Sequence, residues 1–386
     1  MDLEFTKEQK LLQETYREFC KRNLTREYVR WLDENTTFLP QDMYDKLAEL
    51  GTMGICIPPE YGGMGLGEVE QCIVMEEISR AGVAVGFCSG MAEGFGGRPI
   101  MALGTDAQKK HHLPRIAAGK EKWSLAMTEP AGGTDILGAI RTSATKNSDH
   151  YVVNGSKMWI SGAHVADYLT TLVITNKEVE RKKGLSLLII DARSPGVTIR
   201  PIKKMGIHGC GVNEIYFDNV CVPFENLLGE ENKGWYGLLS VLNPERIATS
   251  MFSLGIAKSA FEYALDYARE RKAFGKTIGS FQILQHYLAE IAIEIENAQN
   301  LIYKCARLCD AGKRYDVEAC MAKVVACRAS ELAARYGMEI MGGYGFAMEY
   351  DMQRHFRDYK QMMFSPISDE MAKNYIAESF GLPRSF

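Results

Sequence analysis

The order in which two kinds of sequence pattern follow each other constrains the fold of this 386-residue chain most strongly. From Trp123 to about residue 223, short β-branched and aromatic runs alternate with turns rich in Gly, Asn and Asp, which predicts β-strands. The flanking segments repeat apolar residues every three or four positions, as helices do. No internal repeat or low-complexity linker interrupts the chain. We therefore expect three parts packed as one body: an all-α domain over 1–120, a β domain over 121–228 and a helical bundle over 229–386.

Local signals agree with this division. Thr6 followed by Gln9 forms the pattern of a capping box, and Leu12, Tyr16 and Phe19 then recur at helical spacing. The clearest expected strands lie in the runs "HYVVNGSKMWIS", "YLTTLVIT", "GLSLLIIDA" and "NEIYFDNVCV". After the last of these, long helical patterns begin again.

Composition excludes several classes of protein. The formal charge is −4, from 45 basic and 49 acidic residues, and no basic block is long enough to follow a phosphate backbone, so we expect no nucleic-acid partner. No window reaches the length of a membrane span and no leader pattern opens the sequence, so we expect a cytoplasmic protein without a membrane partner. The ten cysteines lack the spacing of metal ligands, which favours reduced thiols and no metal site.

Four motifs could carry chemistry, although each has a simple structural explanation. "LAMTEPAGGTDI" at 125–136 offers backbone amides and hydroxyls but reads as a tight turn, and "NGSKMWISGA" at 154–163 holds a tryptophan that by itself suggests core. "ARERKAFGKTIGSFQ" at 268–282 is a basic helix end, and "MGGYGF" at 341–346 is a glycine-terminated helix.

In combination, the order and spacing of these motifs resemble one family over essentially the whole chain, the flavin-dependent acyl-CoA dehydrogenases. The resemblance implies an α+β fold with an N-terminal helical domain, a central β domain and a C-terminal four-helix bundle. It also implies a homotetramer in which FAD lies between the β domain, the bundle and a neighbouring subunit.

The resemblance implies contacts with the FAD ring system from two motifs. Leu125, Met127 and Thr128 match residues that contact the isoalloxazine, and Trp159 and Ser161 match residues that cover its other face. A flat aromatic ring favours such stacking.

Further FAD contacts match positions in the bundle. Arg271 and Phe274 correspond to residues that reach the pyrophosphate and adenine of a neighbour's FAD, and Gln282 and Gly343 to residues that help to hold it. A guanidinium fork suits phosphate well. Glu339 departs from the family, which usually has glutamine there, and a carboxylate lacks the donors of an amide.

The family's usual catalytic base is missing. In most members a glutamate in a short Tyr-Glu-Gly-Thr-like turn removes the α-proton of the acyl-CoA, but counting from the Arg357-Asp358 pair places Ser365, Pro366, Ile367 and Ser368 on that turn. Ser368 remains an implied cofactor contact. Proline also removes the backbone N–H that polarises the thioester carbonyl in relatives, a donor worth on the order of 3 kcal/mol.

Glu245 is the leading replacement. Isovaleryl-CoA dehydrogenases are among the minority of the family that carry the base on the first bundle helix, at the position that Glu245 matches. A base buried against an apolar thioester would have a raised pKa. Alternatively, Asn243, Pro244 and Glu245 read as an N-cap, a first-turn proline and a carboxylate at the start of a helix.

Other polar residues have assignments that remain open. Glu93, in the glycine-rich "GMAEGFGGRPI" helix expected to line the acyl pocket, is the rival base, whereas the pair Asp369–Glu370 reads as a first helical turn. Arg98 could hold a polar group of the acyl chain or extend to the surface, and the glycines could make room for a bulky acyl group.

The CoA part of the substrate has three implied contacts, which are Thr134, Asn243 and Arg246. The expected reaction is α,β-dehydrogenation of an acyl-CoA thioester, with the proton passing to Glu245, the hydride to flavin N5, and electron-transfer flavoprotein reoxidising the flavin. The reverse reaction, reduction of an enoyl-CoA, stays open because relatives that act on carnitine-derived CoA thioesters share the Glu-Arg pair and lack the glutamate of the turn. Two further alternatives are a flavin-dependent oxygenase or oxidase on the same fold and a non-catalytic acyl-CoA- or FAD-binding subunit.

Overall fold

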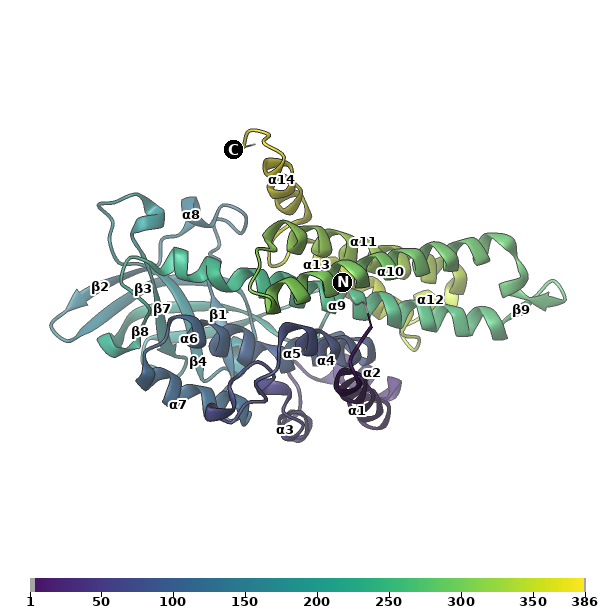
Figure 1. The fold of residues 1–386 in the computed structure, drawn as a ribbon, viewed down its shortest axis with the longest axis horizontal. Coiled ribbons are helices and arrows are strands. Elements are labelled where there is room, and N and C mark those ends of the chain that lie inside the picture. Colours follow the sequence, from purple (N-terminus) through teal and green to yellow (C-terminus); the bar gives the residue numbers. More distant parts are fainter. Residues whose placement is uncertain (1–3, 385–386) are drawn as a thin grey trace.

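The computed structural model describes residues 4–384. Helices at the N-terminus, a β-sheet and a long C-terminal helical bundle pack together, with the sheet and the far tip of the bundle at opposite ends of the long axis (Figure 1). This arrangement agrees with the α+β, three-part fold that the resemblance implies.

The N-terminal part is helical throughout. Thr6 accepts a hydrogen bond from the Gln9 amide, and the Gln9 side chain accepts one from the Thr6 amide, so the expected capping box is confirmed. The helices are α1 (Lys7–Asn23), α2 (Arg26–Asn35), α3 (Gln41–Glu49), α4 (Glu68–Ala81), α5 (Val83–Ala92), the single π-helical turn η3 (Glu93–Gly97), α6 (Arg98–Leu103) and α7 (Asp106–Ala117).

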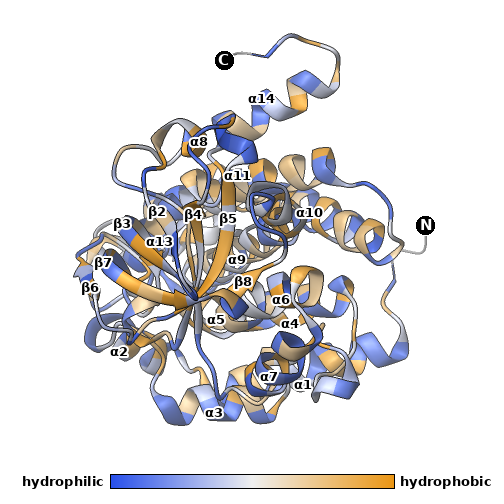
Figure 2. Ribbon diagram, turned by 90° about the vertical axis from the view of Figure 1, so that its left-hand side faces the viewer, coloured by the Kyte–Doolittle hydropathy of each residue, from blue (hydrophilic) through white to orange (hydrophobic). Residues whose placement is uncertain are grey.

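The middle part is one mixed sheet. Its strand order is β6-β7-β3-β2-β4-β5-β8, and β1 pairs with β4 in parallel. β5 is apolar along most of its length (Figure 2), because its residues are buried on both sides. The strands are β1 (Trp123–Ala126), β2 (Ser143–Asn147), β3 (His150–Ser161), β4 (Tyr168–Ile174), β5 (Leu185–Asp191), β6 (Val197–Ile202), β7 (Val212–Pro223) and β8 (Leu227–Leu228); the short helix α8 (Ile136–Ala139) lies between β1 and β2.

The bundle is built on three long helices whose small buried residues allow close packing. α9 and α11 make the most extensive helix–helix contact of the molecule, and Ala322, Ala326, Ala329 and Ala333 recur on the buried face of α11. The elements are α9 (Gly234–Glu270), the hairpin β9 (Lys272–Ala273) and β10 (Lys276–Thr277), α10 (Gln282–Asp310), α11 (Asp316–Met341), α12 (Gly343–Phe346), α13 (Met352–Phe364) and α14 (Asp369–Ser379).

The start of α9 corrects one reading of the sequence. Asn243, Pro244 and Glu245 do not begin the helix, because α9 already begins at Gly234 and Pro244 lies inside it. The Asn-Pro pair imitates a helix start, since Asn is a good N-cap and Pro a good first residue. Glu245 therefore caps nothing, and helix capping does not explain a carboxylate at this place.

Buried residues of the N-terminal helices and of the bundle form one continuous core. It extends from Tyr16 of α1 through Ile73 of α4 to Ala257 of α9 and Ala326 of α11. In the described part of the chain, none of the helices combines the length and apolar composition that a membrane crossing requires.

Candidate active site

A cavity lies where the N-terminal helices, the sheet and the bundle meet. Its wall is formed by residues of α4, α5, η3, α6, β1 and α9. Leu125 of β1 and Glu245 of α9 both line it. The cavity thus joins an expected flavin contact and the expected base.

Glu245 stands on this wall without a polar partner. No hydrogen bond or ion pair joins its carboxylate to another described residue, and its neighbours along the wall include Val241, Ala248 and Phe252. Burial raises the pKa of Glu245 to about 7, and the only opposing charge is that of Arg246. The carboxyl group can therefore accept or release a proton near neutral pH.

Arg98 is held inside the protein by three groups. Its guanidinium bonds Glu68 at 2.8 Å and the Cys56 thiol at 3.4 Å, and lies 3.8 Å from Glu93. The reading in which Arg98 extends to the surface is wrong, because Glu68, thirty positions earlier in the chain, supplies a buried counter-charge.

Glu93 lies behind the cavity wall, not on it. The cavity is lined by Gly94, Arg98 and Glu68, whereas Glu93 is 1% exposed and accepts a hydrogen bond from the Cys56 amide. Burial raises the pKa of Glu93, against the charge of Arg98. The helix that carries Glu93 therefore borders the cavity through Gly90, Gly94 and Arg98, and a role for Glu93 itself stays a prediction.

A buried lysine organises the sheet side of the site. Lys157 bonds the Met127 carbonyl at 3.0 Å and the Glu129 carboxylate at 2.9 Å, and Glu129 also accepts the amides of Arg141 and Thr142. This network ties the "MTEP" turn to strand β3. The pKa of Lys157 falls to about 8 because burial penalises its charge, with Glu129 opposing the fall.

Trp159 leaves the sheet at a bulge. The pairing of β3 with β7 shifts register between Lys157 and Ile160, and Trp159 takes the left-handed backbone conformation with φ of 64°. Its indole is 56% exposed, whereas Trp123 is 1% exposed. The reading of Trp159 as core is wrong. A strained backbone that presents an apolar ring to solvent is typical of a ligand site.

The neighbouring turn is joined to β3 on the same side. The Met158 amide donates to the Thr128 carbonyl at 2.9 Å, and the Ser124 hydroxyl donates to the Ser161 carbonyl at 2.7 Å. These two hydrogen bonds join the segment that holds Ser124 and Thr128 to the end of strand β3, where Trp159 and Ser161 lie. Thr134 lies exposed farther along the turn.

The remaining cofactor candidates gather at the far tip of the bundle. Arg271 ends α9, its guanidinium lies 5.4 Å from the Tyr344 ring centre, and no described carboxylate pairs with it. Phe274, at the turn of the β9–β10 hairpin, is 94% exposed. Gln282, Glu339 and Gly343 are also exposed here, at the ends of α10, α11 and α12. Figure 1 shows this tip far from the sheet.

The turn that lacks the usual glutamate is held in place by buried polar contacts. Lys323 of α11, fully buried, bonds the Asp369 carboxylate at 2.6 Å and the Met363 carbonyl at 2.9 Å. Ser368 caps α14 by accepting the Met371 amide. Asp369 begins α14 as expected, but it is also one half of this buried ion pair, which the sequence reading missed.

Asn243 and Arg246 form a pair one helical turn apart on α9. The Arg246 guanidinium donates to the Asn243 side chain and lies 5.9 Å from the Tyr375 ring centre of α14. Both side chains are partly exposed. They occupy the space between α9 and the C-terminal helix.

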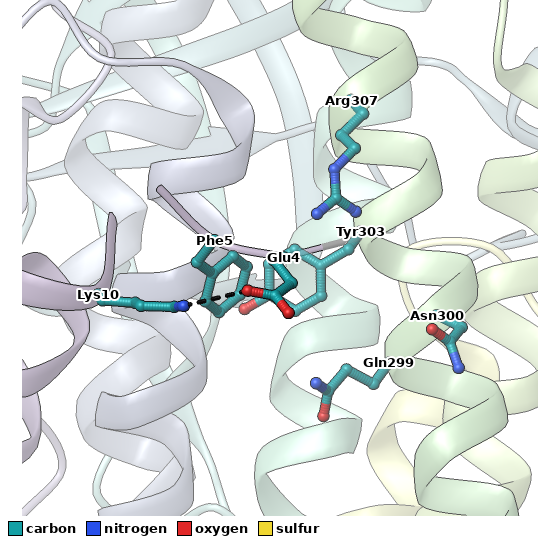
Figure 3. Close-up of a pocket in the computed structure, with 7 residues that line it drawn as sticks. All are labelled: Glu4, Phe5, Lys10, Gln299, Asn300, Tyr303 and Arg307. Carbon is teal, nitrogen blue, oxygen red and sulfur yellow. Dashed lines mark hydrogen bonds and ion pairs between the residues drawn. The ribbon is translucent and has the colours of Figure 1, made fainter. Parts of the chain in front are cut away.

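A second hollow has no connection to these residues. It lies between the N-terminal segment and α10, where Glu4 pairs with Lys10 and Phe5 packs against Tyr303 (Figure 3). The hydroxyl of Tyr303 donates to Glu76 inside the core. None of the expected site residues lies there.

The sheet face and the bundle tip suit FAD in their chemistry. The exposed indole of Trp159 and the "MTEP" turn offer a flat apolar surface beside backbone groups, and the unpaired guanidinium of Arg271 beside the exposed Phe274 suits a phosphate next to an aromatic base. The carboxylate of Glu339 is exposed on the same tip, where its charge is hydrated.

Comparison with known proteins covers nearly the whole chain. Three family models match in order: the acyl-CoA dehydrogenase N-terminal domain at residues 6–120, the middle domain at 124–220 and the C-terminal domain at 232–381. A protein of Bacillus subtilis named as a probable acyl-CoA dehydrogenase is 36% identical, over 98% of this chain and 99% of its own.

Two further matches are a subunit of a reductase complex and a solved structure of an enzyme with its acyl-CoA. Subunit CarC of the caffeyl-CoA reductase–Etf complex of Acetobacterium woodii is 36% identical over 92% of this chain and 93% of its own. The solved structure of a glutaryl-coenzyme A dehydrogenase with glutaryl-CoA has a TM-score of 0.95 and 33% identity, covering 100% of this chain and 98% of that one.

Proposed function

Because this chain belongs to the acyl-CoA dehydrogenase family and is an FAD-dependent oxidoreductase acting on acyl-CoA thioesters, we propose that Glu245 is its catalytic base. One observation carries this proposal. Glu245 is a carboxylate on the cavity wall that has no polar partner among the described residues and whose pKa is raised to about 7.

The roles of the other residues follow from their positions. Bound FAD supplies the acceptor for the hydride. Leu125, Met127 and Thr128 contact the isoalloxazine, and Trp159 and Ser161 cover its other face; together these five residues of the β domain form the ring-binding wall. Glu245 takes the α-proton from the opposite side of the cavity, and the apolar side chains around it exclude water from the transfer.

The turn at Pro366 offers substitutes for the lost backbone donor. The amides of Ile367 and Ser368 have no hydrogen-bond partner among the described residues. Lys323 and Asp369 hold the turn from the buried side. We assign polarisation of the thioester carbonyl to one of these two amides, since an unpaired N–H next to the proline can replace the missing one.

Contacts with CoA fall to Thr134, Asn243 and Arg246. Arg246 and Asn243 already hold each other on α9, and their partial exposure leaves donors available for a phosphate or pantetheine group. Thr134 lies on the exposed turn after the ring-binding wall.

The electron partner is an electron-transfer flavoprotein. A relative of similar length is named as a subunit of a reductase–Etf complex, which supports both this partner and the reductive direction as an alternative to dehydrogenation. Either direction uses the same groups, with Glu245 releasing the proton instead of taking it.

The assembly is a homotetramer in which FAD is shared between subunits. In one chain, the sheet and the bundle tip at β9 lie toward opposite ends of the long axis (Figure 1), which supports an FAD that is shared between subunits. All ten cysteines are free, which supports a reducing compartment such as the cytoplasm.

The decisive test replaces Glu245 by glutamine. We expect the anaerobic rate of flavin reduction by a good acyl-CoA substrate to fall by about 10²- to 10⁴-fold, because the amide cannot take the proton. The FAD content should not change, since Glu245 is not among the residues assigned to FAD.

Glu93→Gln is the matched control, because Glu93 is a second glutamate near the cavity, and it should retain most of the rate. Unchanged flavin reduction in Glu245→Gln would refute the assignment. Rapid reaction of the reduced flavin with oxygen would instead favour the oxidase or oxygenase alternative, and flavin that stays oxidised with every acyl-CoA would favour the non-catalytic one.

A further inference from the structure

Two glycines of the cavity wall are not explained by the fold. Gly90 lies in α5 and Gly94 in the π-helical turn η3, and both line the cavity. Neither has a positive φ, so an L-residue could adopt the same backbone. Glycine also destabilises a helix relative to alanine, so its presence needs a reason.

Packing does not supply that reason at these positions. A Cβ atom added to Gly94 would meet no atom within 4 Å, and one added to Gly90 would meet only the Met75 sulfur at 3.6 Å, an ordinary contact. Gly96, two positions on, differs, because a Cβ there would lie 2.4 Å from the Trp123 ring. Glycine is required by close packing at 96, whereas at 90 and 94 it leaves open space.

The rest of the wall indicates what that space accepts. Phe87 and Phe252 stack with their ring centres 4.8 Å apart, and Phe95 and Met91 also line the cavity. The charges on the wall besides Glu245 are Arg98 and Glu68, which pair with each other at 2.8 Å. A ligand therefore meets aromatic and thioether groups and finds no free charge to pair with its own.

We propose that Gly94, with Gly90, determines specificity by holding space for a bulky, uncharged acyl group, branched or ring-bearing. The proposal rests on the acyl-CoA reaction and names its substrate class. The π-helical turn contributes, since the extra residue widens the helix at the place where it borders the cavity.

The experiment compares four acyl-CoA substrates on the FAD-loaded enzyme: butyryl, isovaleryl, 3-phenylpropionyl and glutaryl. The wild-type protein should act best on isovaleryl-CoA or on 3-phenylpropionyl-CoA. A preference for isovaleryl-CoA would indicate a branched acyl group, and a preference for 3-phenylpropionyl-CoA a ring-bearing one. In Gly94→Ala the kcat/KM for that substrate should fall at least tenfold, while the value for butyryl-CoA stays within threefold. Gly94→Val should enlarge the loss.

Gly97→Ala is the matched control. Gly97 belongs to the same π-helical turn but does not line the cavity, and its added Cβ would make ordinary contacts of 3.5 Å with Glu93 and Ile57. It should leave the order of substrates unchanged. The midpoint of thermal unfolding should not fall in Gly94→Ala, which separates a filled cavity from a damaged fold.

Binding measured by titration calorimetry keeps the test independent of turnover. The bulky acyl-CoA should bind at least tenfold more weakly to Gly94→Ala than to the wild type, even if the reaction itself is not seen. Preference of the wild type for butyryl- or glutaryl-CoA, or an equal loss for all substrates in Gly94→Ala, would overturn the proposal. Loss of turnover with binding preserved would instead count against the assigned catalytic chemistry.

Discussion

Two glutamates near one cavity, Glu93 fully buried and Glu245 half-buried, differ in what surrounds them. Glu93 lies behind the wall, accepts a hydrogen bond from the Cys56 amide and lies 3.8 Å from the Arg98 guanidinium. Glu245 lies on the wall among apolar side chains, with no polar partner among the described residues. The difference is the reason why we propose Glu245, and not the more deeply buried Glu93, as the base. A base needs a face open to the substrate and no competing partner.

The largest effect should come from removing the Arg98 guanidinium, the positive charge that lies next to both Glu93 and Glu68. Arg98→Met leaves both carboxylates buried without their cation, and we expect it to lower the free energy of unfolding by about 3–5 kcal/mol. Urea unfolding monitored by circular dichroism measures this. Arg22→Met is the control, because its ion pair with Glu18 is exposed and should contribute less than about 1 kcal/mol. Equal effects would show that the Arg98 cluster is not a structural unit.

The pH dependence of the reaction should report Glu245. Because its pKa is about 7, the ionised fraction rises about tenfold per pH unit below that value and levels off above it. For dehydrogenation, kcat/KM should rise with pH in the same way, whereas for enoyl-CoA reduction it should fall above pH 7. Stopped-flow kinetics between pH 5.5 and 8.5 measure both. A flat profile in the dehydrogenation direction would contradict the role of Glu245.

The pH dependence of the free energy of unfolding should show whether Glu245 has a structural role. The folded pKa of Glu245 lies above the value of 4.5 for an unperturbed group, so the wild type loses stability as the pH rises from about 4.5 to about 7. Glu245→Gln does not titrate and should therefore be more stable than the wild type at pH 8, by about 3 kcal/mol, with no difference at pH 4. Urea unfolding at the two pH values checks this. A destabilised variant at pH 8 would indicate a partner for the carboxylate.

The smallest effect should come from Glu93→Gln. The amide oxygen can still accept from Cys56, and the wall of the cavity is unchanged, so stability should shift by less than about 1 kcal/mol and kcat/KM by less than about threefold. Steady-state kinetics and urea unfolding measure both values. A loss of 100-fold in kcat/KM would restore Glu93 as the base.

Sequence patterns predicted the parts of the molecule that depend on local chemistry. The Thr6 capping box and the runs in β3, β4, β5 and β7 follow from short-range periodicity and turn residues, and the structure contains them. The short strand β1 and the edge strand β6 escaped notice, because each is too brief or too mixed to show alternation.

The features that the sequence did not predict correctly depend on contacts between residues far apart in the chain. The buried state of Arg98 depends on Glu68, and the clamp on the Pro366 turn depends on Lys323, which is 46 positions from its partner Asp369. Pro244 suggested a helix start because local propensity does not include the tertiary packing that keeps α9 helical on both sides of this proline. Trp159 left the core because a bulge, which depends on the pairing of β3 with β7, turned it outward.

Helix α9 carries Glu245 near one end and Arg271 at the other, roughly 39 Å apart at about 1.5 Å per residue. In the proposed assembly, this single rod serves the acyl cavity of its own chain and the pyrophosphate of the next. Each subunit would then retain its FAD only while its neighbouring subunit is in place. Enzyme diluted to nanomolar levels should bleach slowly as subunits part and regain activity when free flavin is supplied, so low specific activity in dilute assays would reflect missing neighbours, not damaged active sites.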